Sequence, residues 1–198
     1  AVPQASLART AYLSTKRFLD VAIAGLGLVV TAPLLLLLGY LVKRESPGPA
    51  IFRQMRVGEM GRTFVMYKLR TMRRDTAPYD YKPEDETDSR LTPLGRVLRK
   101  WSLDELPQLV NILRGEMSLV GPRPEQPFIV ERYEPWQRGR LLVRPGLTGW
   151  WQVNGRSDKP LHLHTEYDLL YVQNQSLWMD LKILLMTVPA VLGRRGAR

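Results

Sequence analysis

The feature that most limits how this chain folds is a continuous apolar segment near its start. Val21–Val42 contains 22 residues without a charge, and basic pairs flank it on both sides, Lys16-Arg17 and Lys43-Arg44. At about 1.5 Å per residue a straight helix of this length reaches roughly 33 Å, enough to cross the apolar core of a bilayer. A cleaved signal peptide has a shorter apolar region, typically about 7–15 residues. We therefore expect a membrane helix, with a buried helix of a soluble protein as the alternative.

Two details predict that this helix does not cross the membrane in a straight line. Pro33 lies in the middle of the segment, where a proline removes one backbone hydrogen bond and kinks a helix. Because both flanks are basic, the preference of positive loops for the cytoplasm gives no direction of crossing. A helix that enters the membrane, bends at Ala32-Pro33 and leaves on the same face satisfies both flanks. We therefore prefer a re-entrant helix over residues 14–45 to a straight span.

The charge distribution supports a membrane partner. Lysine and arginine exceed aspartate and glutamate by 29 − 19 = 10. Residues 1–74 carry +9, residues 75–90 carry −4 and residues 91–157 carry +4. Such an excess suits nucleic acid, an anionic membrane surface or a phosphorylated substrate. Since most of it surrounds the apolar segment and no nucleic-acid-binding signature is present, we expect anionic lipids and no nucleic acid. The absence of cysteine excludes disulfides, thiolate zinc sites and cysteine nucleophiles.

The remaining pattern predicts a mainly α fold with a small β-hairpin, forming one compact domain over residues 46–198. The hairpin strands are Ile51–Val57 and Thr63–Leu69. The expected helices are Leu94–Lys100, Leu106–Leu113, one near Phe128–Arg140, Leu161–Asn174 and Leu177–Leu192. Trp150–Val153 has the composition of a short strand, and the acidic segment Asp75–Arg90 that of a mobile loop, either a lid over a site or simply solvated. The last helix, 177–192, suits an amphipathic position at the membrane interface or a place in the core.

The strongest local signal is a pair of adjacent carboxylates, Asp104 and Glu105, which follow a basic cluster at the start of an apolar helix. One interpretation is structural, since Ser102 and Glu105 have the spacing of a capping box. The other is chemical: a helix dipole and nearby guanidinium groups keep Asp104 ionised, which suits a nucleophile or a metal ligand. Neighbouring helical residues point about 100° apart, so the two acids would have different roles.

Several cations are candidates for binding phosphate, because the planar guanidinium group of arginine contacts two phosphate oxygens at once. Arg123 lies between two prolines, and Arg144 precedes Pro-Gly, so both have a stiff backbone. Lys68 and Arg70, with Arg73 and Arg74, suit lipid head groups or a diphosphate. An ordinary basic surface is the alternative for all of them. Two histidines, at positions 162 and 164, do not belong to a cluster of carboxylate ligands in the sequence and do not indicate a metal site.

Five ordered motifs resemble the monotopic phosphoglycosyl transferases, the bacterial sugar transferase family of polyprenyl-phosphate hexose-1-phosphate transferases. They are Lys16–Asp20, Tyr67–Met72, Ser102–Gln108, Met117–Pro124 and Val143–Gly149. The resemblance extends from about Lys16 to Leu192 and is closest to the short form with the catalytic domain alone. Residues 1–13 lie outside it as a tail. Several relatives have serine where this chain has Ala32, so another group must satisfy the backbone at the bend.

The resemblance implies a transferase that moves a sugar 1-phosphate from a UDP-sugar to polyprenyl (undecaprenyl) phosphate, the first step of a lipid-linked polysaccharide pathway. Asp104 would attack the β-phosphate, release UMP and hold the phosphosugar covalently. Glu105 would be its partner acid, and Arg123 would clamp phosphate with support from Arg99, Arg144 and Lys68. Mg²⁺ is the expected cofactor, bound by Asp104 and the substrate phosphates.

The resemblance also places the re-entrant helix in the bacterial inner membrane, with the catalytic domain on the cytoplasmic side. A homodimer is compatible with the sequence. The sugar and the glycan pathway stay open. The competing hypothesis is a basic peripheral membrane protein without catalytic activity.

Overall fold

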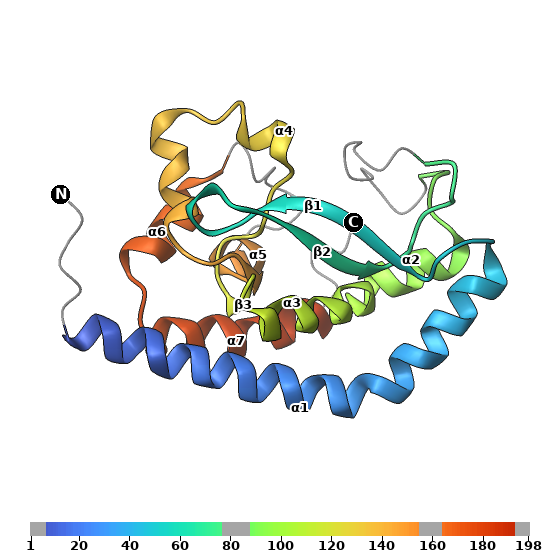
Figure 1. The fold of residues 1–198 in the computed structure, drawn as a ribbon, viewed down its shortest axis with the longest axis horizontal. Coiled ribbons are helices and arrows are strands. Elements are labelled where there is room, and N and C mark those ends of the chain that lie inside the picture. The colour runs from blue at the N-terminus through green and yellow to red at the C-terminus, as the bar shows by residue number, and fades with distance from the viewer. Residues whose placement is uncertain (1–6, 77–87, 155–163, 193–198) are drawn as a thin grey trace.

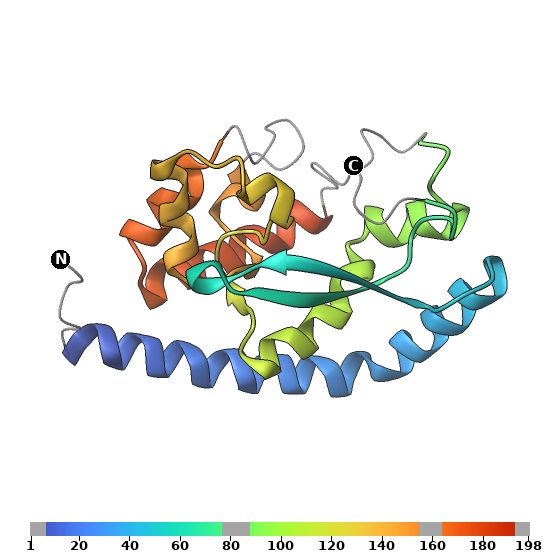
Figure 2. The ribbon, with the colours of Figure 1, turned by 45° about the horizontal axis from the view of Figure 1, so that its top comes forward.

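The computed structural model describes residues 7–76, 88–154 and 164–192. Helix α1 (Leu7–Glu45) runs along one side of the molecule, and the rest of the described chain packs on its concave side (Figures 1 and 2). Strands β1 (Ile51–Val57) and β2 (Thr63–Leu69) form an antiparallel hairpin, joined by the short 3-10 turn η1 (Glu59–Gly61). Both strands have the predicted bounds, so the expected fold class, mainly helical with a small hairpin, is confirmed.

The remaining elements are short. In chain order they are α2 (Pro93–Lys100), the 3-10 segment η2 (Leu103–Gln108), α3 (Leu109–Arg114), β3 (Ser118–Val120), α4 (Pro127–Val130), the 3-10 segment η3 (Pro135–Leu142), β4 (Gly146–Thr148), α5 (Trp150–Asn154), α6 (Glu166–Gln173) and α7 (Leu177–Leu192). Strands β3 and β4 pair in parallel, an element that the sequence did not predict. Their close approach depends on Gly121, where an added Cβ would lie 2.4 Å from the carbonyl oxygen of Arg144.

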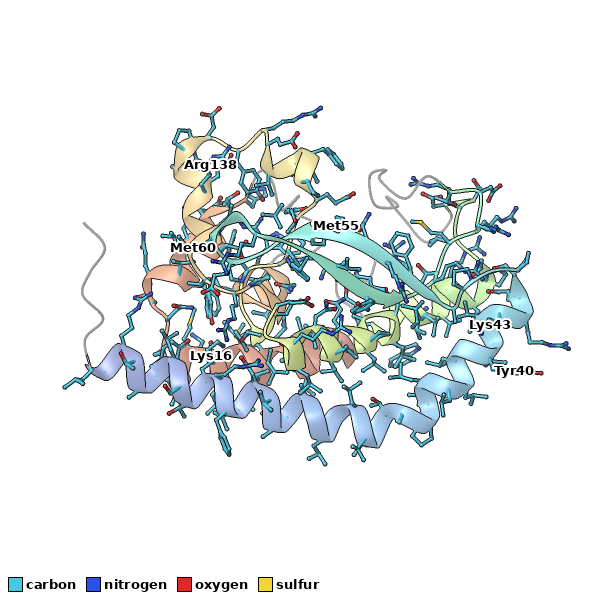
Figure 3. All side chains as sticks on the ribbon, viewed as in Figure 1. Lys16, Tyr40, Lys43, Met55, Met60 and Arg138 are labelled. Atoms are coloured by element: carbon cyan, nitrogen blue, oxygen red, sulfur yellow. The ribbon has the colours of Figure 1, made fainter. Side chains whose placement is uncertain are left out.

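Helix α1 bends along its length. Lys16 lies on one arm and Tyr40 and Lys43 lie on the other (Figure 3), and the interval between them contains Pro33. The hydroxyl of Thr31 donates a 2.6 Å hydrogen bond to the carbonyl oxygen of Gly27. A hydroxyl bonded one turn back along a helix favours bending. Thr31 therefore assists the bend in a chain that has Ala32 before the proline.

The outer side of α1 is covered with apolar side chains. Those more than half exposed include Leu26, Val29, Val30, Leu36 and Leu37. Within the described residues, α1 is the one helix long and apolar enough to cross a membrane. A continuous apolar surface of this size is rare in a protein surrounded by water. It therefore marks α1 as the membrane-associated element.

The first arm of α1 is fastened to the domain by polar contacts. Lys16 forms a 2.8 Å ion pair with Asp180 of α7. Arg17 donates to the carbonyl oxygens of Ile112 and Leu113 at the end of α3, at 2.6 and 2.8 Å. These two basic residues, expected as membrane flanks, thus contact protein. The helix begins at Leu7, so residues 7–13, expected as a tail, belong to it.

A buried carboxylate on α1 holds β3, the strand that leads to the loop containing Arg123. Asp20 is 2% exposed and accepts hydrogen bonds from Ser118 Oγ at 3.1 Å and Leu119 N at 2.9 Å. At the far end of α1, Arg70 donates to the carbonyl oxygens of Ser46 and Pro47, at 2.7 and 2.8 Å. Arg70, a candidate for lipid or diphosphate, is therefore engaged in ending α1.

The core lies between α1 and the rest of the domain. Its main cluster combines side chains from α1, β2, α3, β3, α6 and α7, namely Ala24, Met66, Leu109, Ile112, Val120, Tyr171 and Ile183. A smaller cluster joins the second arm of α1 to the hairpin and α2 through Leu38, Val42, Leu69 and Leu98. Both arms of α1 thus pack against the domain.

Three predicted elements differ from the structure. The single helix expected over 128–140 is divided into α4 and η3, because Glu134 is extended (φ −63°, ψ 153°) before Pro135. The strand expected at Trp150–Val153 is the helix α5. The helix expected from Leu106 starts as η2 and becomes an α-helix only at Leu109.

The C-terminal helix α7 has the predicted bounds. Ile183 is fully buried in the core, while Trp178 and Leu185 are exposed. The helix therefore contributes to the core, and its position at the membrane interface stays a prediction. Helix α6 begins at Glu166, so His164 and Thr165, which the expected helix 161–174 included, precede it, and residues 161–163 lie outside the described residues. Most of the expected loop 75–90 also lies outside them.

Candidate active site

The two candidate carboxylates lie in η2, which follows a sharp turn at Ser102. Ser102 has a left-handed backbone (φ 55°, ψ 23°), and its side chain makes no capping hydrogen bond. The capping-box interpretation is therefore wrong. Segment η2 packs between β2 and α2. Helix α2 approaches the end of β2 so closely that a Cβ on Gly95 would lie 2.0 Å from the carbonyl oxygen of Thr71. This close contact fixes the position of α2, and therefore of η2, which follows it in the chain.

Glu105 is held by two cations. Its Oε1 accepts from Lys68 Nζ at 2.8 Å and from Arg123 Nη2 at 2.7 Å. Burial alone would raise the pKa of Glu105, but the charges of Arg123 and Lys68 outweigh it and hold that pKa well below its ordinary range. Glu105 is therefore a fixed negative charge that gathers Lys68 and Arg123, and it is poorly suited to exchanging protons.

Asp104 has the opposite surroundings. It is 7% exposed, and its side chain forms no hydrogen bond or ion pair with another described residue. Burial raises its pKa to about 6, and the negative charge of Glu105 acts in the same direction, while Lys68, Arg99 and Arg123 oppose the rise. At neutral pH Asp104 is mostly ionised and unpartnered. It is also a stronger base than an exposed carboxylate, which favours attack on phosphorus.

Two further predicted cations face these carboxylates. Arg99 is near enough for the charges of Asp104 and Glu105 to act on its pKa, although burial is the larger effect and lowers it. Its Nη1 is buried and has no hydrogen-bond partner among the described residues. Burial also lowers the pKa of Lys68. The site thus holds more positive charge than its two carboxylates neutralise, and one buried donor is left for an anion.

Arg123 reaches the site from the loop between β3 and α4. Its pKa is raised, chiefly by the charge of Glu105. A third of its side chain is exposed, and its Nη1 and Nε donate no hydrogen bond to another described residue. One nitrogen is therefore anchored on Glu105, while the rest of the guanidinium group is available to a phosphate.

Arg144 is not part of this cluster. Its side chain pairs with Glu59 at the hairpin turn, with 3.4 Å between Arg144 Nε and Glu59 Oε2, and both side chains are more than a third exposed. Its backbone lies beside Gly121, two residues before Arg123. The structure thus brings together five predicted site residues, Lys68, Arg99, Asp104, Glu105 and Arg123, and leaves the side chain of Arg144 outside.

Sequence reasoning missed the roles of three buried charged residues. Asp20 belongs to the first motif, but its buried role is invisible in the sequence. Arg140 and Asp168 form a buried ion pair, yet they are 28 positions apart and neither lies in one of the five motifs.

The two histidines considered in the sequence do not lie together in a described site. His164 pairs with Glu166 on the surface, at 3.0 Å, and residue 162 lies outside the described residues.

A buried, unpartnered carboxylate among fixed cations is the kind of site that handles phosphorylated substrates. Comparison with known proteins agrees. The family model described as bacterial sugar transferase matches residues 11–194. The chain belongs to the bacterial sugar transferase family, as its motifs predicted.

Several relatives carry informative names. A UDP-glucose:undecaprenyl-phosphate glucose-1-phosphate transferase of Caulobacter vibrioides is 46% identical, over 96% of this chain and 74% of the relative. A UDP-N-acetylgalactosamine-undecaprenyl-phosphate N-acetylgalactosaminephosphotransferase of Aeromonas hydrophila is 39% identical, over 94% of this chain and 46% of the relative. An exopolysaccharide production protein of Sinorhizobium fredii is 43% identical, over 92% of this chain and 88% of the relative. This chain therefore spans less than half of the Aeromonas relative and most of the other two.

Proposed function

We propose that this chain transfers a sugar 1-phosphate from a UDP-sugar to undecaprenyl phosphate. The observation that carries the proposal is Asp104, a buried and unpartnered carboxylate with three cations around it. The names of the relatives supply the two substrates, a UDP-sugar and undecaprenyl phosphate. The related proteins use different sugars, so the sugar is to be determined by assaying a panel of UDP-sugars.

The proposed chemistry has two displacements at one phosphorus atom. A carboxylate oxygen of Asp104 attacks the β-phosphorus of the UDP-sugar, and the bond from that phosphorus to the bridging oxygen breaks, so UMP leaves with the electron pair. A phosphate oxygen of undecaprenyl phosphate then attacks the same phosphorus and releases Asp104. The product is undecaprenyl diphosphate carrying the sugar, and the enzyme is regenerated.

The cations have distinct tasks in this scheme. Lys68 and Arg123 are held by Glu105 before substrate arrives, so they do not need to be reorganised as charge moves onto the phosphoryl oxygens. The buried Nη1 of Arg99 lacks a protein partner and suits an oxygen of the diphosphate. Glu105 acts as the counter-charge that fixes the cations.

Mg²⁺ fits the residues present. The described residues contain no cluster of three or more His, Cys, Asp or Glu side chains that would form a complete metal cage. However, Mg²⁺ commonly binds one or two carboxylates together with substrate phosphates. Asp104 would hold the ion, which would supply charge neutralisation to the diphosphate when bound. Full turnover in the presence of a chelator would exclude this role.

Replacing Asp104 tests the proposed reaction. We expect Asp104→Asn to abolish UMP release from UDP-glucose, UDP-galactose or UDP-N-acetylgalactosamine in the presence of undecaprenyl phosphate, because an amide cannot form the intermediate. Wild type incubated with radiolabelled UDP-sugar alone should retain label on the protein, and the variant should not. The matched control is Glu131→Gln, an exposed change of the same kind, which should leave the rate unchanged.

The same assay distinguishes the transferase from the competing hypothesis. A basic peripheral membrane protein without activity would release no UMP in wild type with any of these sugars. Normal turnover by Asp104→Asn, in a variant that still folds and binds membranes, would overturn the assignment of the nucleophile.

We also propose that α1 is re-entrant, entering and leaving the inner membrane on the cytoplasmic face. The bend in α1, its exposed apolar outer side and the packing of both arms against one domain support this topology. A straight crossing would pull one arm away from the contacts that it makes with the domain.

A further inference from the structure

A buried ion pair lies behind the site and takes no part in the chemistry proposed above. Arg140 of η3 and Asp168 of α6 are joined at 2.9 Å from Nε and at 2.6 Å from Nη2 to the same oxygen, Oδ2. Their side chains are 1% and 0% exposed. A buried ion pair is weak evidence for a contribution to stability, because the cost of removing both charges from water offsets their attraction. A role other than stability therefore has to be considered for this pair.

The guanidinium group of Arg140 makes two contacts besides the ion pair. Its Nη2 donates a 2.6 Å hydrogen bond to the carbonyl oxygen of Arg123. Its Nη1 donates to the hydroxyl of Tyr133, whose ring centroid lies 5.7 Å from Arg140 Cζ. Arg140 is thus locked by Asp168 and Tyr133, and it presents one donor to the peptide of Arg123.

Arg123 is consequently held at two points. Its carbonyl oxygen is bound by Arg140, and its guanidinium group is bound by Glu105 at 2.7 Å. The loop before it is fixed by the parallel strands, since Gly121 N donates to Thr148 O at 2.9 Å and Gly146 N donates to Pro122 O at 2.8 Å. Among the described residues, Arg140 is the one whose side chain hydrogen-bonds to the peptide of Arg123.

We infer that Arg140 and Asp168 are positioning residues, which set the direction of the Arg123 guanidinium group through its backbone. This inference rests on the proposed function, because it assigns Arg123 a task on phosphate. Asp168 holds the guanidinium group of Arg140, and Arg140 binds the carbonyl oxygen of Arg123. The guanidinium group of Arg123 then contacts Glu105, beside the place where we propose that the substrate phosphate binds. Small misplacements of a positioned group reduce turnover strongly.

Arginine is needed at position 140 because one planar fork serves three partners. A lysine has the same charge but offers its donors from one nitrogen atom. The variant Arg140→Lys therefore retains a cation for Asp168 and loses the geometry that also reaches Arg123 O and the Tyr133 hydroxyl. This separates the orienting role of Arg140 from its charge.

The test compares Arg140→Lys with Arg138→Lys in the full chain reconstituted in nanodiscs. Arg138 lies on the same segment, is exposed and is on the side of the domain far from α1 (Figure 3). Steady-state UMP release gives kcat and KM for the UDP-sugar. We expect Arg140→Lys to lower kcat at least tenfold, with KM changed less than threefold and a folded fraction like that of wild type. Arg138→Lys should match wild type.

A double-mutant cycle distinguishes positioning from a general loss of structure. In the background of Arg123→Lys, where the guanidinium group to be positioned is absent, Arg140→Lys should cost less than threefold in kcat. Multiplicative losses in the double variant would overturn the inference, as would normal kcat in Arg140→Lys. A wild type that releases no UMP would instead overturn the proposed function.

A milder variant serves if Arg140→Lys does not fold. Tyr133→Phe keeps the ring and the ion pair and removes only the hydroxyl that accepts from Arg140. We expect a two- to fivefold fall in kcat that disappears in the Arg123→Lys background. The same fall in both backgrounds, or no fall in either, would contradict a positioning role.

Discussion

Asp104 and Glu105 are neighbours in sequence, yet their surroundings move their pKa values in opposite directions. Glu105 shares one oxygen between Lys68 and Arg123, which hold its pKa low despite burial. Asp104 has no such partner, and burial raises its pKa to about 6. Two adjacent carboxylates thus have different surroundings: Glu105 is paired with two cations, and Asp104 has no hydrogen-bond partner among the described residues. Adjacent positions on the 3-10 segment η2 make this difference possible.

This arrangement predicts that Asp104 destabilises the protein at high pH. Its folded-state pKa, about 6, lies above the ordinary value of 3.8, so ionisation costs folding free energy as pH rises through 6. We expect Asp104→Asn to be more stable than wild type at pH 8, by up to about 3 kcal/mol, and no more stable near pH 4. Thermal unfolding of the metal-free protein in detergent measures this difference, with Glu131→Gln as control. An equal gain at both pH values would contradict the explanation.

At the scale of elements, α1 is part of the catalytic domain as well as its membrane anchor. Arg17 binds the last carbonyl oxygens of α3, the helix that continues directly from η2, which contains Asp104 and Glu105. Asp20 holds β3, the strand that leads to Arg123. Both sides of the site are therefore positioned by one arm of the membrane helix. Separating α1 from the domain would leave buried polar groups of α3 and β3 without partners.

The attachment of β3 gives a prediction for Asp20. Replacing Asp20 by alanine leaves the buried Leu119 N–H without its acceptor, which costs about 1–3 kcal/mol. Asp20→Asn retains an acceptor oxygen and should lose less. We expect the melting temperature in nanodiscs to fall in the order wild type, Asp20→Asn, Asp20→Ala. Equal melting temperatures for wild type and Asp20→Ala would show that this contact does not hold β3.

Elements with a regular hydrophobic pattern were predictable from the sequence. The hairpin strands and α7 have the predicted bounds because their apolar positions repeat along seven or more residues. The three-residue strands β3 and β4 are too short to show a pattern, and α5 reads as a strand because its tryptophan and valine favour strands. Tertiary packing overrides that preference at Trp151, which is buried.

The site residues that lie within a single sequence motif were predictable. Asp104 and Glu105 are recognisable as adjacent acids beside basic residues, and Arg123 by its two prolines. Their contacts come from distant segments: Lys68 of β2, itself a predicted candidate, pairs with Glu105, and Arg140 of η3 donates to the carbonyl oxygen of Arg123. A contact between residues far apart in the chain leaves no periodicity in a single sequence, so these pairings emerge only in the folded chain. For Arg144 the motif indicated the loop correctly, but its side chain points to Glu59.

At the scale of the whole molecule, the two arms of α1 pack against the same domain (Figure 1). The proposed re-entrant topology then places both ends of α1 on the cytoplasmic side. The chain contains no cysteine, which allows this to be tested with single substitutions at Ala11 and Lys43, both exposed and close to the ends of α1.

Labelling with a membrane-impermeant maleimide distinguishes the topologies. We expect Ala11→Cys and Lys43→Cys both to react in inside-out vesicles and both to be protected in intact spheroplasts, because both would face the cytoplasm. A straight crossing would instead make one of the two react in spheroplasts. Asp75→Cys, in an exposed position of the domain, reports the side on which the domain lies.

The re-entrant topology proposed for α1 would also remove a constraint that ordinary spanning helices obey. A helix that crosses a bilayer must match its hydrophobic length to the thickness of the hydrocarbon, and mismatch costs energy for every ångström. A helix that turns back inside one leaflet has no opposite surface to reach. Lengthening the lipid acyl chains should therefore leave the anchoring of this domain unchanged, and the same sequence would suit membranes of different thickness.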